Sequence, residues 1–295
     1  MQEFGRLITA MVTPFTPEGH VDFERAQALA KKLVAEGSDG LVVSGTTGES
    51  PTLSKEEKLR LFAAVKAAVG DTARVIAGTG SYNTAETVAF SQEAAKAGAD
   101  ALLLISPYYN KPNQAGLLAH FSAVADAVEL PIMLYNHPGR TGVTIEPATM
   151  VALARHPRIK AVKDSSGSMD LVTDYKRQLP DDFGLYSGDD PLTLFYLAVG
   201  GTGVVSVSSH VAGPQIRRMI EAWDRGDVAE ARRIHLALYA LSKVLFLAPS
   251  PGPVKYALAH EGFPVGGVRL PLVPMTPDEE RKVAFVLENK TAVSA

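Results

Sequence analysis

The chain has 295 residues, of which 46% are hydrophobic and 21% are charged, and its formal net charge is -3 at pH 7. This composition predicts a globular protein with a sizeable core and without a basic surface for nucleic acid or anionic membrane. There is no cysteine, which excludes disulfides, thiolate zinc sites and cysteine nucleophiles. The sequence also has neither a signal-peptide pattern nor an uninterrupted apolar run of about 18 residues, so we expect a cytoplasmic protein.

Short apolar runs alternate with amphipathic helical patterns over residues 1–225. Runs such as ALLLI and PIML lack polar positions, which is typical of parallel strands buried on both faces. Eight such strands, each followed by a helix, favour a closed (β/α)8 TIM barrel over an open sheet. The expected strands are 7–11, 40–43, 74–77, 101–105, 131–135, 159–162, 184–187 and 203–206, and the expected helices are 23–36, 55–69, 85–97, 114–127, 146–154, 169–178, 191–199 and 213–225.

The alternation ends after Arg225. Helical patterns at 227–248, 252–261 and 277–288 follow without a strand between them, separated by segments rich in proline and glycine. We therefore divide the chain into a catalytic barrel, residues 1–225, and a helical C-terminal extension packed on it, residues 226–295, whose last residues fray. In the barrel, Ser54 followed by Glu57 predicts an N-cap with a capping box.

Lys163 directly follows the expected strand 159–162 and precedes small polar residues. A lysine at this position often only extends into solvent. In a barrel, however, the carboxyl ends of all strands meet at one face, which is where active sites lie. Burial there lowers the pKa of a lysine because it disfavours the charged form, and a neutral amine attacks a ketone or aldehyde to form an imine. The pattern therefore favours carbon–carbon chemistry through a Schiff base.

Three other features of that face fit such chemistry. Tyr135 ends the neighbouring strand and could carry protons, although it could equally be a packed aromatic residue. Arg140 lies in a turn five residues later and could hold a substrate carboxylate, or could simply be solvated. The loop with Thr46 and Thr47 offers hydroxyls and backbone N–H groups to a carboxylate, or could merely cap a helix.

Two further patterns were considered as cofactor or metal sites, and neither predicts one. Gly78-Thr79-Gly80 lacks the third glycine of a dinucleotide fingerprint, so a nicotinamide cofactor is not expected. The seven histidines show no HxH or HExxH spacing, so the sequence offers no obvious ligand set for a metal-dependent aldolase. His137 and His210 are expected at the carboxyl face, in a supporting or structural role.

The chain resembles the dihydrodipicolinate synthase and N-acetylneuraminate lyase family in motifs that occur in the same order over almost its whole length. They are GTTGES at 45–50, GTGSYNT at 78–84, SPYYNKPNQAGLLAHF at 106–121, YNHPGRTG at 135–142, AVKDSSG at 161–167 and SGDD at 187–190.

The resemblance implies a role for each candidate residue and no cofactor or metal. Lys163 would form a covalent imine with pyruvate, and Tyr135, Thr47 and Tyr109 would form a proton relay. Tyr109 would reach the active site of a neighbouring subunit, which implies a tight dimer, usually paired into a homotetramer. Pyruvate would be bound by Thr46, Thr47, Gly188 and the backbone around Val205, and the carboxylate of the second substrate by Arg140.

Two residues favour the synthase branch of the family, which condenses pyruvate with aspartate 4-semialdehyde on the route to lysine and diaminopimelate. Thr46 replaces the serine usual in the lyases, and Arg140 follows the tyrosine of the fifth strand. His137, where a small aliphatic residue is usual, leaves the acceptor aldehyde open. The alternatives are a lyase or aldolase for a 2-keto-3-deoxy sugar acid or hydroxy-oxo-glutarate, and a catalytically silent barrel that acts by binding.

Sensitivity to lysine is a separate expectation from the resemblance. Relatives that lysine inhibits use an asparagine and a histidine that align with Tyr82 and Lys58, while Glu86 is kept. Because a cationic side chain near a cationic ligand costs free energy, we expect weak inhibition or none.

Overall fold

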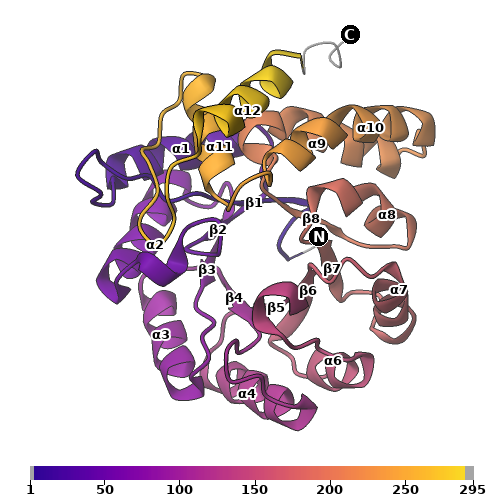
Figure 1. Ribbon diagram of the computed structural model, residues 1–295. Coiled ribbons are helices and arrows are strands. Elements are labelled where there is room, and N and C mark those ends of the chain that lie inside the picture. Colours follow the sequence, from indigo (N-terminus) through magenta and orange to yellow (C-terminus); the bar gives the residue numbers. More distant parts are fainter. Residues whose placement is uncertain (1–2, 290–295) are drawn as a thin grey trace.

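The computed structural model describes residues 3–289 and contains a closed barrel of eight parallel strands in chain order (Figure 1). Strand β1 pairs with both β2 and β8, which closes the sheet. The strand residues are mostly buried, because side chains fill the interior and helices cover the outside. The strands are β1 (Leu7–Ala10), β2 (Gly40–Val43), β3 (Arg74–Gly78), β4 (Ala101–Ile105), β5 (Ile132–Asn136), β6 (Ile159–Asp164), β7 (Gly184–Ser187) and β8 (Gly203–Ser206).

The helices form an outer ring around the barrel, and α2 begins with the predicted capping box: the Ser54 hydroxyl accepts from the Glu57 N–H and the Glu57 carboxylate accepts from the Ser54 N–H. The ring consists of α1 (Phe23–Ala35), α2 (Lys55–Val69), α3 (Thr84–Lys96), α4 (Gln114–Ala127), α6 (Pro147–Ala154), α7 (Met169–Gln178), α8 (Thr193–Ala198) and α9 (Ser209–Asp224). The short helix α5 (Pro138–Thr141) follows β5 at the mouth of the barrel, and 3-10 turns occur at Ser50–Thr52 and Asp190–Leu192.

The barrel prediction is confirmed, and most differences lie at element ends. Strand β6 continues to Asp164, so Lys163 lies inside it, because the backbone ladder pairs Lys163 with Tyr135 and Tyr186 whatever the polarity of its side chain. The short helix α5 was not predicted. Helix α9 begins at Ser209, four residues before the predicted start, with a kink at Ala212 shortly before Pro214.

Three helices follow the barrel: α10 (Val228–Val244), α11 (Gly252–His260) and α12 (Pro277–Asn289). Helix α10 packs on α9, and α11 packs on α9 and α12. Leu241, Val254 and Val283 belong to the same hydrophobic cluster as the barrel residues, so the extension shares the core of the barrel. Whether residue 225 is a domain boundary stays a prediction, and the predicted fraying tail lies outside the described residues.

The segment that joins α11 to α12 crosses from the extension to the helix α2 side of the barrel (Figure 1). This crossing brings Arg269 into contact with Glu49, in the loop that follows β2, and with Glu57 of helix α2. Within residues 3–289, no helix has the length and apolar character needed to cross a membrane.

Candidate active site

Lys163 and Tyr135 lie together at the carboxyl ends of β6 and β5, as the sequence predicts. The two residues are partners in the strand ladder, and the Lys163 Nζ lies 4.3 Å from the centroid of the Tyr135 ring. Lys163 is only 6% exposed. A cation over an aromatic face is attracted by the ring quadrupole, so the aromatic ring holds the lysine side chain inside the barrel mouth instead of in solvent.

The residue after the lysine fixes this pair in place. Asp164 is fully buried, and its carboxylate accepts hydrogen bonds from the Asn136 Nδ2 at 2.6 Å and the Tyr196 hydroxyl at 2.8 Å. Burial and the Asp164 charge raise the pKa of Tyr196, so that hydroxyl stays a donor. These bonds join the ends of β5 and β6. Asp164 was not predicted as a site residue, because the predicted strand ended at residue 162 and left Asp164 in the following loop.

Gly188 provides space for the lysine. A Cβ atom on Gly188 would lie 3.0 Å from the Lys163 Cε and 1.9 Å from the Ser165 Oγ, closer than atoms pack. The Gly188 N–H also donates to the Asp164 carbonyl at 2.7 Å. Burial raises the pKa of the adjacent Asp189, and the nearby positive charge of Lys163 opposes that rise. Gly188 therefore shapes the site by lacking a side chain.

The loop between β2 and α2 carries both threonines at the barrel mouth. Thr47 is buried and Thr46 is half-buried. Two non-glycine residues of this loop, Ser44 and Glu49, adopt left-handed backbone conformations with φ of 57° and 55°. Such conformations cost of order 1 kcal/mol each and persist only where surrounding contacts enforce them. The loop is thus held in an unfavourable shape that places the threonines.

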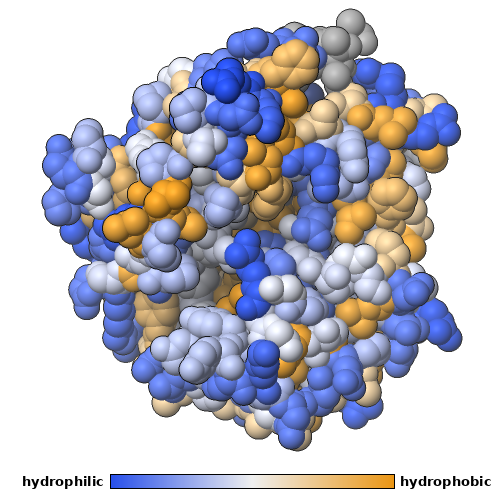
Figure 2. Space-filling model, viewed as in Figure 1, coloured by the Kyte–Doolittle hydropathy of each residue, from blue (hydrophilic) through white to orange (hydrophobic). Residues whose placement is uncertain are grey.

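A cavity of about 770 Å³ opens at this end of the barrel, and Thr46, Tyr135 and Arg140 line it. Figure 2 shows the same face hollowed near its centre, with hydrophilic and hydrophobic residues around the hollow. The cavity continues past Tyr108 to the surface between α2 and α3, where Lys58, Tyr82 and Glu86 line it. Of the predicted catalytic residues, Tyr135 lines this cavity, whereas Lys163, Thr47 and Tyr109 do not. Lys163 lies behind the cavity wall, against the Tyr135 ring.

Arg140 and His137 belong to the turn after β5. Helix α5 forms there because Pro138 suits a first helical position, and the Arg140 N–H donates to the His137 carbonyl at 2.9 Å. Arg140 is exposed at the cavity. The His137 ring packs against Tyr135 with centroids 5.6 Å apart. Burial, and then the charges of Arg140 and Lys163, lower the pKa of His137 to about 4, so the ring is neutral at pH 7.

Three predicted residues lie apart from this cluster. Tyr109 is 92% exposed, with φ of 69°, and does not line the cavity that its neighbour Tyr108 lines. Val205 is buried in β8, two strands from Lys163. His210 is structural: its Nε2 accepts from the Val12 N–H at 3.1 Å and its Nδ1 donates to the Val207 carbonyl at 2.8 Å.

An eight-stranded barrel with a buried lysine at the carboxyl ends of its strands, beside a tyrosine and a loop with two threonines, is typical of lyases that work through an imine. Comparison with known proteins gives the family. Residues 3–290 match the dihydrodipicolinate synthetase family, and the chain belongs to it.

Relatives and solved structures agree with this assignment over nearly their whole length. The chain is 56% identical over 287 residues to the 4-hydroxy-tetrahydrodipicolinate synthase of Heliobacterium modesticaldum, covering 97% of this chain and 96% of the relative. The lysine-bound dihydrodipicolinate synthase of Cyanidioschyzon merolae superposes with a TM-score of 0.97 at 47% identity, covering 99% of both chains. A structure described as the first monomeric variant of the enzyme superposes at 0.95 with 34% identity, covering 98% of this chain and 97% of that one.

Proposed function

We propose that this protein condenses pyruvate with L-aspartate 4-semialdehyde, the reaction of the 4-hydroxy-tetrahydrodipicolinate synthases that it resembles at about half of all positions, and so serves lysine and diaminopimelate biosynthesis. The observation that carries the proposal is the buried Lys163 against the Tyr135 ring at the cavity. A lysine held in this way is suited to form an imine with a keto acid.

The chemistry follows from the chain's own residues and uses no cofactor. The Lys163 amine attacks the C2 carbonyl of pyruvate, and loss of water gives the imine, for which Tyr135 and Thr47 carry the protons. Loss of a C3 proton gives an enamine, whose C3 attacks the aldehyde of the second substrate and forms the new carbon–carbon bond. The amino group of that adduct then attacks the imine carbon, closes the ring and releases the Lys163 amine.

Each substrate has its own carboxylate site in this proposal. Pyruvate is held by Thr46, Thr47 and the backbone near Val205, with Gly188 leaving room beside the imine. Arg140, exposed at the cavity, holds the carboxylate of the semialdehyde through its planar pair of donors.

Borohydride reduction in the presence of pyruvate tests the imine. We expect a pyruvate-derived adduct on Lys163, which blocks trypsin there and gives a peptide spanning 161–176. Lys163→Met abolishes the adduct, whereas Lys160→Met, a lysine on the same strand, keeps it. An unmodified Lys163 after reduction would rule out the enzyme and leave a barrel that acts by binding.

Arg140→Ala separates the synthase from other pyruvate lyases of the family. The variant still forms the pyruvate imine, but its kcat/KM for the semialdehyde falls by about 100-fold, since a charged hydrogen-bonding partner of about 3 kcal/mol is lost. Equal turnover of the semialdehyde by Arg140→Ala and the parent protein would instead favour a 2-keto-3-deoxy sugar acid or hydroxy-oxo-glutarate as substrate.

We also propose a tight dimer, paired into a homotetramer, in which Tyr109 serves the partner's active site. The exposure of Tyr109 and the description of one relative as a monomeric variant support this. Co-expression of Lys163→Met and Tyr109→Phe subunits tests it: a mixed dimer then has one complete site and exceeds the activity of both parents. If Tyr109 acted within its own chain, mixing would recover nothing. Analytical ultracentrifugation gives the oligomer size, and cell fractionation tests the proposed cytoplasmic location.

A further inference from the structure

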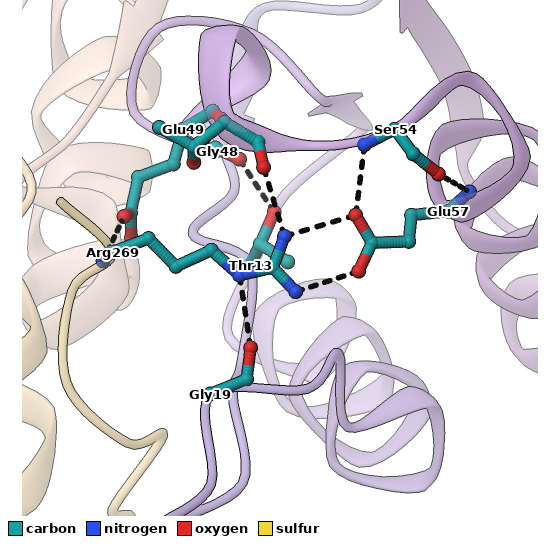
Figure 3. A network of polar contacts seen from close by, with 8 residues as sticks. Thr13, Gly19, Gly48, Glu49, Ser54, Glu57 and Arg269 are labelled. Carbon is teal, nitrogen blue, oxygen red and sulfur yellow. Dashed lines mark hydrogen bonds and ion pairs between the residues drawn. The ribbon is translucent and has the colours of Figure 1, made fainter.

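The loop that carries Thr46 and Thr47 is supported from outside the barrel. Its backbone is left-handed at Ser44 and Glu49, and a strained conformation of this kind requires contacts that enforce it. Within the loop, the Ser50 N–H donates to the Gly45 carbonyl at 3.2 Å. Below it, the Thr13 hydroxyl donates to the Gly48 carbonyl at 2.6 Å (Figure 3).

Glu49, one of the two left-handed residues of the loop, forms a buried ion pair with the C-terminal extension. Glu49 is 2% exposed and Lys255 of helix α11 is 4% exposed. The Lys255 Nζ lies 2.6 Å from the Glu49 Oε1, and it also donates to the Gly267 carbonyl at 2.6 Å and lies 4.1 Å from the Phe15 ring centroid. The pair therefore joins the C-terminal extension to the catalytic loop in the protein interior.

A second contact from the extension completes the attachment. The other oxygen of Glu49 accepts from the Arg269 backbone N–H at 2.9 Å. The Arg269 guanidinium donates to both carboxylate oxygens of Glu57, at 2.6 and 2.9 Å, to the Thr52 carbonyl and, through Nε, to the Gly19 carbonyl (Figure 3). Because Arg269 is fixed at four points, its N–H is a rigid support for Glu49.

We propose that Glu49 and Lys255 are positioning residues for the pyruvate carboxylate: the C-terminal extension sets the place of Thr46 and Thr47 through this buried ion pair. The inference rests on the proposed function, because it assigns the threonines to pyruvate. It explains why the chain buries two charges where an apolar pair would pack at lower desolvation cost. The Glu49 carboxylate is held by two fixed partners, the Lys255 Nζ and the Arg269 N–H. Such directional contacts define the position of the loop more closely than apolar contacts do.

The electrostatics of the pair agree with this role. Burial lowers the pKa of Lys255 to about 8, opposed by Glu49, and the nearby charge of Arg269 lowers it slightly further. At pH 7 the lysine is still protonated, so the Glu49 carboxylate has a cationic partner. Removal of either charge leaves the other one buried without its partner.

Glu49→Gln is the test, because it keeps the size of the side chain and removes its charge. We expect the KM for pyruvate to rise about tenfold and kcat to fall about 10- to 100-fold, as for a small displacement of a substrate-positioning group. The KM for the semialdehyde stays within about twofold, because Arg140 lies on a different loop. At saturating pyruvate, borohydride still traps the imine on Lys163.

The control is Asp100→Asn, at the opposite end of the barrel. Asp100 accepts from the Val75 N–H at 2.8 Å and pairs with Lys66 at 2.8 Å, so its loss lowers the melting temperature without reaching the loop. The double variant Glu49→Gln/Lys255→Met removes both buried charges. We expect it to melt higher than Lys255→Met alone and to keep the raised KM for pyruvate.

Four outcomes overturn the inference: an unchanged KM for pyruvate in Glu49→Gln, a parallel rise in both KM values, a return to the parent KM in the double variant, or the same KM rise in Asp100→Asn. A parent protein that traps no pyruvate contradicts the proposed function instead. The same set of assays therefore distinguishes failure of the positioning role of Glu49 and Lys255 from failure of the proposed function.

Discussion

Gly188→Ala is the sharpest test of how the structure positions Lys163. The new Cβ would lie 1.9 Å from the Ser165 Oγ, 3.0 Å from the Lys163 Cε and 3.1 Å from the Asp164 carbonyl oxygen. The Ser165 hydroxyl is buried without a hydrogen-bond partner in the part of the chain that is described, so it can rotate away at small cost. The contacts with the lysine and with the carbonyl oxygen are about equally tight. Because a lysine side chain moves more easily than the strand backbone, we expect the lysine to shift.

The expected result is a large loss of activity with a small loss of stability. Relief of the overlap costs about 1–3 kcal/mol, as for one added methyl group in a packed site. A displacement of the lysine chain by a few tenths of an ångström or more, at a centre where bonds form, lowers kcat by about 100-fold. Steady-state kinetics, borohydride trapping and thermal melting of the same preparation measure the three quantities.

Gly167→Ala is the matched control, since it lies in the loop that follows β6. Its φ is 72° and no atom lies within 4 Å of the added Cβ, so it introduces backbone strain of about 1–2 kcal/mol without contact to the lysine. We expect a similar fall in melting temperature and nearly full activity. Equal losses of kcat in the two variants, or parent activity in Gly188→Ala, would refute the reasoning.

Three further outcomes follow from the structure. Tyr135→Phe keeps the ring against Lys163 and loses the hydroxyl, so pyruvate is still trapped while kcat falls by about 100-fold or more; unchanged kcat would remove Tyr135 from the proton relay. Burial lowers the pKa of His210 to about 4, so the folded protein binds fewer protons than the unfolded chain between pH 4 and 6.5. The neutral His210 contributes roughly 3 kcal/mol to the free energy of unfolding; this contribution is complete above pH 6.5 and is lost as the pH falls toward 4. In urea unfolding, the free energy of unfolding should therefore differ less between pH 7 and pH 4.5 in His210→Gln than in the parent protein. Added lysine inhibits weakly or not at all, because Lys58 lines that end of the cavity, and half-inhibition below millimolar lysine would contradict this.

The sequence determined the barrel and most of the strand ends. Runs such as ALLLI and PIML are typical of strands covered on both faces, and eight strand candidates separated by helical patterns leave few alternatives. The same pattern brought Lys163, Tyr135 and Arg140 to one face, because in a barrel the carboxyl ends of consecutive strands are neighbours. Motifs in that order were then sufficient to indicate the family.

Tertiary structure alone decided which polar residues support the site. Glu49 and Lys255 are about 200 positions apart in the sequence, and neither the loop motif nor an amphipathic helix indicates that the two charges meet in the interior. Gly188 gives no local signal that Lys163 occupies the space beside it, and the exposure of Tyr109 is visible only once the loop is folded. Periodicity and local motifs report the environment of one element at a time, whereas a buried ion pair or a steric gap depends on how distant elements approach one another.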